Sequence, residues 1–219
     1  MNNSTVKKLC VLAMLSALAY IVMVVGRFPI VLFLKYDPKD IIITIGGFLY
    51  GPIAAFAITT IVSTVEMITV SSTGPIGLLM NIVAGSSFAC TAAFIYKKNR
   101  TLKGAVIGLV VAWLFTTVVM VLWNYLITPL YMGVAREQVA ALLIPAFIPF
   151  NLLKGGLNAA FTMLLYKPVK KALQKANLMP IPEDDEEVVK GKINFGVIAA
   201  SFFVILTCVL WVLVLQGVL

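Results

Sequence analysis

The sequence of 219 residues contains no histidine, only three cysteines and few charged side chains. Without histidine, imidazole cannot serve as a metal ligand, a catalytic base or a proton relay. Cys10, Cys90 and Cys208 lie far apart in apolar runs, so they match neither a metal-binding motif nor a disulfide framework. Nucleotide-binding loops, zinc-protease motifs and nucleophile elbows are also missing, which indicates a protein that is not an enzyme and does not hydrolyse ATP itself.

Hydrophobic residues make up 61% of the chain and charged residues 12%. A soluble domain is about half apolar and about a quarter charged. The polar surface is therefore too small for a water-soluble globule, and the composition predicts an integral membrane protein. The net charge of +8 then reflects basic cytoplasmic loops and not a partner nucleic acid.

Seven apolar runs are long enough, or nearly long enough, to cross a bilayer as helices. They cover residues 9–25, 41–50, 53–70, 76–96, 104–127, 141–166 and 193–215. The second run is short and meets the third at Gly51-Pro52, which predicts a short or tilted helix that turns directly into the next. The expected fold class is an all-α polytopic membrane protein.

Basic residues predict the orientation of these helices. With a cytoplasmic N-terminus, twelve of the 17 lysines and arginines lie in cytoplasmic segments and four lie outside. The positive-inside rule then favours this orientation, with the C-terminus extracellular. The acidic stretch 176–192 is typical of a solvated cytoplasmic linker. It divides a six-helix domain, residues 1–175, from an appended seventh helix, residues 193–219, which we expect to be peripheral and to face lipid.

Polar side chains inside the fifth and sixth runs are the strongest sign of a binding site. Asn151 and Lys154 are three residues apart, so they share one face of a helix. A charge inside a membrane segment usually faces a cavity or a partner, although a long lysine side chain can also reach the outer surface. Asn124 lies between Trp123 and Tyr125, and these aromatic residues are also typical of the membrane interface.

The segment 26–40 is partly apolar, which a merely solvated loop would not require. We expect it to be extracellular and to fold over the bundle as a lid. Asp40, at its end, is either part of that lid or the N-cap of the second helix, and the two roles are compatible.

Three further positions carry open alternatives. Glu66 has three possible roles: it binds a proton or a sodium ion, it pairs with Lys154, or it lies near a helix end. Asn81 belongs either to a pocket or to a packing hydrogen bond. Ala13 and Ala17 are small residues four apart, which allows close contact between helices, either with a partner or within the bundle.

Several segments together resemble a known family. They are Phe33–Asp40, Gly46–Pro52, Asn124-Tyr125 followed by Pro129-Leu130-Tyr131, and Pro149–Gly155. In this order and spacing they are similar to the riboflavin-binding S component of the bacterial energy-coupling factor (ECF) vitamin transporters. The similarity spans roughly residues 5–175, and the tail beyond it departs from the usual six-helix pattern.

The resemblance implies a six-helix bundle in the bacterial cell membrane, with an outward-facing vitamin pocket beneath a lid. Riboflavin would be the transported ligand, and no cofactor is expected. The partners would be a membrane coupling protein (the T component) and two cytoplasmic ATPase subunits, with Ala13 and Ala17 at the docking face. No metal site is expected. The residues that the resemblance places at the substrate are Tyr36, Asp40, Thr44, Asn81, Asn124, Asn151 and Lys154.

Alternative functions remain open at this stage. The first is an S component for another vitamin or for a phosphorylated flavin such as FMN, with Arg27, Lys35 and Lys39 as phosphate contacts. The second is an ion-coupled secondary carrier that uses Glu66. The third is a structural or signalling membrane subunit without a ligand.

Overall fold

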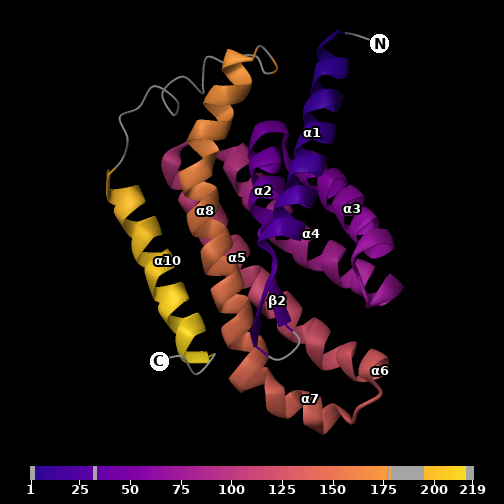
Figure 1. The fold of residues 1–219 in the computed structure, drawn as a ribbon. Coiled ribbons are helices and arrows are strands. Elements are labelled where there is room, and N and C mark those ends of the chain that lie inside the picture. Colours follow the sequence, from indigo (N-terminus) through magenta and orange to yellow (C-terminus); the bar gives the residue numbers. More distant parts are fainter. Residues whose placement is uncertain (1–2, 32–33, 177, 179–194, 216–219) are drawn as a thin grey trace.

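A computed structural model describes residues 3–31, 34–176, 178 and 195–215. In chain order, its elements are α1 (Asn3–Gly26), β1 (Phe28–Val31), β2 (Leu34–Tyr36), α2 (Lys39–Tyr50), α3 (Pro52–Thr69), α4 (Gly74–Lys98), α5 (Leu102–Leu126), α6 (Thr128–Met132), α7 (Arg136–Leu142), a π-helical turn (Leu143–Phe147), α8 (Ile148–Lys175) and α10 (Phe195–Leu215). The long helices form one bundle, with the start of α1 at one end and α6 and α7 at the other (Figure 1). The predicted all-α fold is confirmed.

Six helices in the described part of the chain are long and apolar enough to cross a membrane. The exception among the seven predicted runs is α2, which has 12 residues. At about 1.5 Å per residue it is roughly 18 Å long, too short for a hydrocarbon core about 30 Å thick. Residues 39–49 of α2 are all buried. At Gly51, whose φ of 92° suits glycine, the chain turns and Pro52 begins α3. The predicted short helix with a direct turn is therefore confirmed.

Two regions differ from the sequence prediction. The expected lid contains a small antiparallel hairpin, in which β1 pairs with β2 and Phe28 lies opposite Tyr36. Leu32 and Phe33, between the strands, lie outside the described residues. The sixth run was predicted to end at residue 166, but α8 continues to Lys175 through Pro168.

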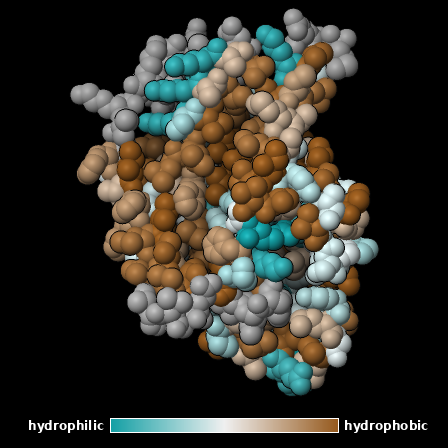
Figure 2. Space-filling view, viewed as in Figure 1, coloured by the Kyte–Doolittle hydropathy of each residue, from teal (hydrophilic) through white to brown (hydrophobic). Residues whose placement is uncertain are grey.

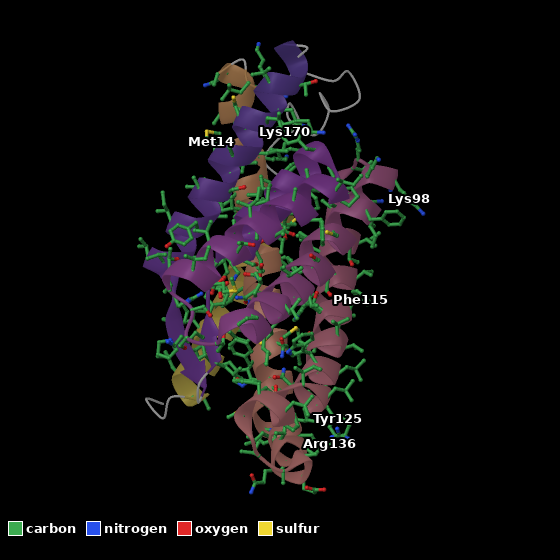
Figure 3. The ribbon with its side chains drawn as sticks, turned by 90° about the vertical axis from the view of Figure 1, so that its right-hand side faces the viewer. Met14, Lys98, Phe115, Tyr125, Arg136 and Lys170 are labelled. Carbon is green, nitrogen blue, oxygen red and sulfur yellow. The ribbon has the colours of Figure 1, made fainter. Side chains whose placement is uncertain are left out.

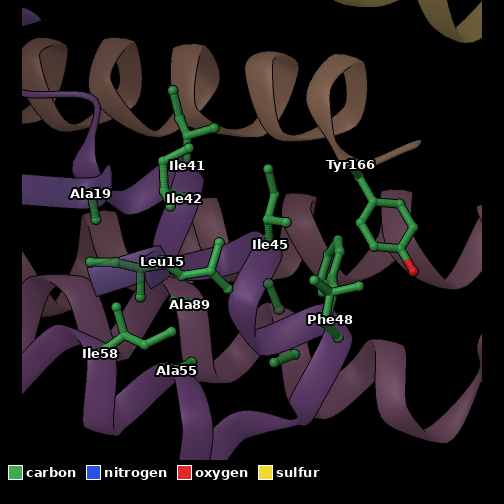
Figure 4. Close-up of a cluster of buried hydrophobic side chains, with 14 of the residues drawn as sticks. Leu15, Ala19, Ile41, Ile42, Ile45, Phe48, Ala55, Ile58, Ala89 and Tyr166 are labelled. Carbon is green, nitrogen blue, oxygen red and sulfur yellow. The ribbon is translucent and has the colours of Figure 1, made fainter. Parts of the chain in front are cut away.

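Small residues bring the helices close together on the side of the bundle nearer the start of α1. A Cβ atom added to Gly47 of α2 would lie 2.9 Å from the Cβ of Ala93 in α4 and 3.0 Å from that of Ala55 in α3. A Cβ on Gly108 of α5 would lie 2.9 Å from the carbonyl oxygen of Ala92. Larger residues at these positions would force the helices apart. Figure 4 shows the apolar cluster around α2, including Ile45 and Phe48.

The two ends of the bundle differ in charge. The lysines of the α4–α5 turn and of the last part of α8 lie near the start of α1, where Figure 3 labels Lys98 and Lys170. Figure 2 shows hydrophilic residues gathered at this end above a mostly apolar surface. Tyr125 and Arg136 lie at the opposite end (Figure 3), where the arginine stacks 5.5 Å from the tyrosine ring centre. The apolar length between the ends suits a bilayer.

The helix α10 packs along the outside of α8 (Figure 1). One face of α10 is buried, and its Cys208 and Val212 contact a cluster that includes Leu153 and Leu157 of α8 and Ile30 of β1. Phe202 and Phe203, on another face, are both 66% exposed. The helix is therefore peripheral and has a broad apolar surface of the kind that faces lipid. Of the predicted linker, 176–192, only residues 176 and 178 are described.

Candidate functional site

A cavity of about 200 Å³ lies beneath the hairpin, at the end of the bundle opposite the start of α1. Its wall combines an apolar part, a row of amides and a group of charged side chains. The lining residues come from the hairpin segment, four long helices (α3, α4, α5 and α8), two short ones (α2 and α6) and the turn between α3 and α4: Arg27, Leu34, Lys35, Asp37, Asp40, Glu66, Val70, Ser71, Ser72, Thr73, Met80, Asn81, Ala84, Phe88, Thr116, Met120, Asn124, Tyr131, Phe150, Asn151, Lys154, Gly155 and Asn158.

The helix α8 contributes a polar stripe to this wall. Asn151, Lys154 and Asn158 are spaced by three and four residues, so they project from one face of the helix. The amide nitrogen of Asn151 donates to the carbonyl oxygen of Phe147 at 2.8 Å. Because a carboxamide nitrogen carries two hydrogens, one donor remains beyond this local bond. The stripe can therefore donate hydrogen bonds into the cavity.

The helix α5 faces this stripe with a third buried amide. Asn124 donates to the carbonyl oxygen of Met120 at 2.7 Å and accepts from the hydroxyl of Thr128 at 3.0 Å. These bonds fix the orientation of its side chain, which is 4% exposed. Asn124, Asn151 and Lys154 thus line a single hollow, although they lie on two different helices.

Lys154 is held between two carboxylates. Its ammonium nitrogen lies 3.6 Å from an oxygen of Asp37 and 3.5 Å from an oxygen of Asp40. The amide of Asn158 also donates to Asp40 at 3.3 Å. The structure therefore places Lys154 in the cavity wall, and not reaching toward the outer surface. These contacts also tie the chain that follows β2 to the middle of α8.

Glu66 is the centre of a second ionic cluster. Its two carboxylate oxygens pair with Arg27 and Lys39, and the amide of Asn81 donates to one of them at 3.0 Å. The predicted alternative of a Glu66–Lys154 pair is not observed, because the partners are these two cations. Asn81 belongs to the pocket wall and also makes a hydrogen bond, so both of its alternatives hold.

Asp37 joins the two clusters. Its carboxylate lies 3.7 Å from Arg27 and 4.0 Å from Lys39, in addition to Lys154. Burial alone would raise the pKa of Asp37, but the positive charges of Lys154, Lys39 and Arg27 outweigh this effect and keep the pKa below its ordinary value. The three paired cations, Arg27, Lys39 and Lys154, therefore balance three carboxylates beside the cavity, as largely buried charges require.

Two further predicted residues, Tyr36 and Thr44, lie close to the cavity without lining it. The hydroxyl of Tyr36 donates to Asn158 at 3.1 Å, so it orients a lining residue. The hydroxyl of Thr44 donates to the backbone oxygen of Asp40 at 2.6 Å. Asp40 itself is within the first turn of α2, and no side chain among the described residues caps that helix, so the predicted N-cap role was wrong.

Ala13 and Ala17 are exposed on α1, whereas Val11, Leu15 and Ala19 face the core. The two alanines therefore do not serve packing within the bundle. They form a patch of small residues on the side of α1 that faces away from the bundle, and neither residue lines the cavity.

Several lining residues were not predicted from the sequence. Ser71, Ser72 and Thr73 form the turn between α3 and α4, and Phe88 and Thr116 face inward from α4 and α5. Serine and threonine are frequent in turns, so the turn gave no sign of a binding role. The one available signal was its position, directly after a run that contains the acidic residue Glu66.

Comparisons with known proteins agree with this architecture. Residues 7–166 match the family model described as "ECF transporter, substrate-specific component". The chain is 29% identical to "Riboflavin transporter RibU" of Staphylococcus aureus, over 80% of this chain and 96% of that protein. It is 30% identical to "Riboflavin transporter FmnP" of Bacillus subtilis, over 74% of this chain and 92% of that protein.

A solved structure is also similar. The chain aligns with a protein described under "Structure and mechanism of the S component of a bacterial ECF transporter" with a TM-score of 0.66 and 30% identity. The alignment covers 78% of this chain and 99% of that chain. The family match ends at residue 166, so α10 lies beyond it.

Proposed function

Because the chain belongs to the family of ECF transporter substrate-specific components, we propose that its cavity binds riboflavin from the outer side of the membrane. The observation that carries this proposal is the convergence of Asn124, Asn151 and Lys154 on one hollow beneath the hairpin. The names of the two riboflavin transporters to which the chain is similar support the same ligand.

The chemistry of the wall suits a flavin. An isoalloxazine ring has apolar faces and an edge of carbonyl and nitrogen groups. Amides can donate to and accept from such an edge, and a lysine can donate to a carbonyl. Phe88, Met120 and Phe150 supply apolar contacts for the faces. The hydroxyls of Ser71 and Thr73 suit the polyhydroxyl side chain of the vitamin.

We further propose that the basic end of the bundle faces the cytoplasm, because lysines and arginines favour that side. The cavity then opens outward, and the hairpin acts as its lid. Transport would require a membrane coupling protein and two cytoplasmic ATPase subunits, with the exposed Ala13 and Ala17 of α1 at the contact with the coupling protein.

The ion-coupled alternative has less support. A carrier of that kind needs a carboxylate that can take up a proton or sodium ion, whereas both oxygens of Glu66 are paired with cations. A subunit without a ligand would not need a cavity lined by so many polar groups.

Equilibrium titration of the purified protein with riboflavin, followed by quenching of flavin fluorescence, tests the proposal. We expect tight binding by the wild type and a loss of at least about tenfold, ~1.4 kcal/mol, in Asn151→Ala and in Lys154→Ala. Thr207→Ala, on the exposed part of α10, is the matched control and should bind as the wild type does.

The two variants separate a binding effect from a folding effect. Lys154→Ala removes the cation that contacts Asp40 and one of the three that contact Asp37, so it will also lower thermal stability. The hydrogen bond of Asn151 is local to its own helix, so Asn151→Ala should keep the melting temperature near that of the wild type. Unchanged affinity in both variants would refute the site.

A further inference from the structure

The charges beside the cavity bear on which flavins can bind. Of the three cations predicted as phosphate contacts, Arg27 and Lys35 line the cavity, whereas Lys39 lies behind the wall, paired with Glu66. Two of them are already paired. Arg27 and Lys39 each contact one oxygen of Glu66, and Asp37 lies within 4.0 Å of both.

These pairs are largely withdrawn from water. The side chain of Lys39 is 2% exposed, that of Glu66 5% and that of Arg27 17%. A phosphate that took Glu66's place would leave the carboxylate buried beside a second anion, which is costly at low dielectric. Lys154 is not a free cation for the phosphate either, because Asp37 and Asp40 already flank it. Lys35 is exposed and hydrated, so it can provide only weak attraction.

We propose that Glu66 is a specificity-determining residue, which favours neutral riboflavin over its phosphate ester because it neutralises Arg27 and Lys39. This inference rests on the proposed function. A hydroxylated side chain can exchange hydrogen bonds with Glu66, Asn81 and the nearby turn without disturbing the ion pairs. A phosphate dianion would have to compete with Glu66 for the same cations.

The test compares three ligands in three proteins by fluorescence titration. The ligands are riboflavin, FMN and lumiflavin, which has the ring but neither the polyhydroxyl chain nor the phosphate. The proteins are the wild type, Glu66→Gln, which removes the charge at constant size, and Glu66→Asp, which keeps the charge. The measured quantity is the ratio of the FMN and riboflavin dissociation constants.

The wild type should bind riboflavin more tightly than FMN. In Glu66→Gln, FMN should bind more tightly than it does to the wild type, and the ratio should fall by at least about tenfold, ~1.4 kcal/mol. Glu66→Asp should keep a ratio close to that of the wild type. If Glu66 had only a structural role, Glu66→Gln would weaken all three ligands in parallel, and an unchanged ratio would overturn the proposal.

A second variant covers the case in which Glu66→Gln does not fold. Arg27→Gln removes a cation and leaves Glu66 less neutralised, so the ratio should rise instead of falling. A ratio that falls or stays the same in Arg27→Gln contradicts the inference. If the wild type binds lumiflavin and riboflavin but prefers FMN, the role of Glu66 is overturned and the proposed function is not. A wild type that binds none of the three overturns the proposed function itself.

Discussion

The same helices pack in two different ways along their length. Near the start of α1, glycine and alanine bring α2, α4 and α5 together, and the hydroxyls of Tyr96 and Tyr166 meet at 2.8 Å. Toward the hairpin, α4, α5 and α8 carry larger polar side chains and enclose a cavity. We call these parts the packed half and the polar half.

The difference shows how a short membrane bundle can hold a site. Burial of apolar side chains and close helix contacts stabilise most of the packed half. One buried charge lies there, because Lys170 is 5.8 Å from the ring centre of Tyr166. The polar half buries three cations and three anions, which are tolerable only because each has a partner of opposite sign. The packed half therefore fixes the helices, and the polar half places the groups that would contact a ligand.

The largest expected effect comes from breaking the packed half. Gly47→Leu adds a side chain where even a Cβ would lie 2.9 Å from Ala93. We expect a loss of about 3 kcal/mol in the free energy of unfolding, and a bundle that does not close at this level. Thermal unfolding in detergent measures it. Ala13→Leu, an exposed position on α1, is the control, and equal melting temperatures for the two variants would contradict the account.

The second prediction concerns the outer surface beside the packed half. Replacing Ala13 and Ala17 together by leucine should leave riboflavin affinity intact, because both residues are exposed and far from the cavity. Uptake into cells should fall by more than about tenfold, since bulky side chains block close approach of a partner helix. Cellular uptake and binding by the purified protein are measured in parallel. Weakened binding would show instead that this face supports the bundle.

The third prediction addresses the attachment of the hairpin in the polar half. Asp37→Asn removes the carboxylate shared by Arg27, Lys39 and Lys154. We expect dissociation of riboflavin to be faster by roughly tenfold, ~1.4 kcal/mol, because the lid is held less firmly. Stopped-flow fluorescence measures the rate. A rate equal to that of the wild type would mean that Asp37 does not hold the lid.

The three cations lower the pKa of Asp37 below its ordinary value, which gives the same contact a pH dependence. Because the pKa of Asp37 is lower in the folded state, the carboxylate's contribution to the stability of the fold is fully present above its unfolded-state pKa. It is lost as the pH falls through the folded-state pKa. Acidification should therefore speed dissociation in the wild type, and this acceleration should be smaller in Asp37→Asn.

The smallest expected effect lies on α10, outside both halves. Val212 is buried against the α8 and β1 cluster, whereas Val209 on the same helix is 46% exposed. Val212→Ala should lower stability by about 1 kcal/mol and Val209→Ala by less. Thermal unfolding compares them. Equal effects would indicate that α10 does not pack on α8 as described.

The helices of both halves could be predicted from the sequence, because a long apolar run in a membrane must satisfy its backbone groups internally and therefore forms a helix. The turn at Gly51 and the cavity position of Lys154 also followed from local patterns. The end of α8 did not, since Pro168 is a residue that usually interrupts a helix, yet α8 continues past it. The strands of the hairpin have only four and three residues, too few for a clear alternation.

The ionic partners could not be predicted at all. Asp37 and Lys154 are separated by more than a hundred residues, and nothing in either neighbourhood specifies the other. Glu66 was recognised as an unusual charge, but its pairing with Arg27 and Lys39 depends on how the hairpin folds back on α3. Contacts of this kind arise from tertiary packing and not from local sequence.

The most direct test of the central claim, that the polar half holds a flavin, is the visible absorption spectrum of the protein purified from cells supplied with riboflavin. We expect a yellow protein whose chromophore is released on denaturation in an amount near one flavin per chain. We expect much less chromophore in the Asn151→Ala protein. A colourless wild type that does not quench the fluorescence of added riboflavin would refute a flavin site in the polar half.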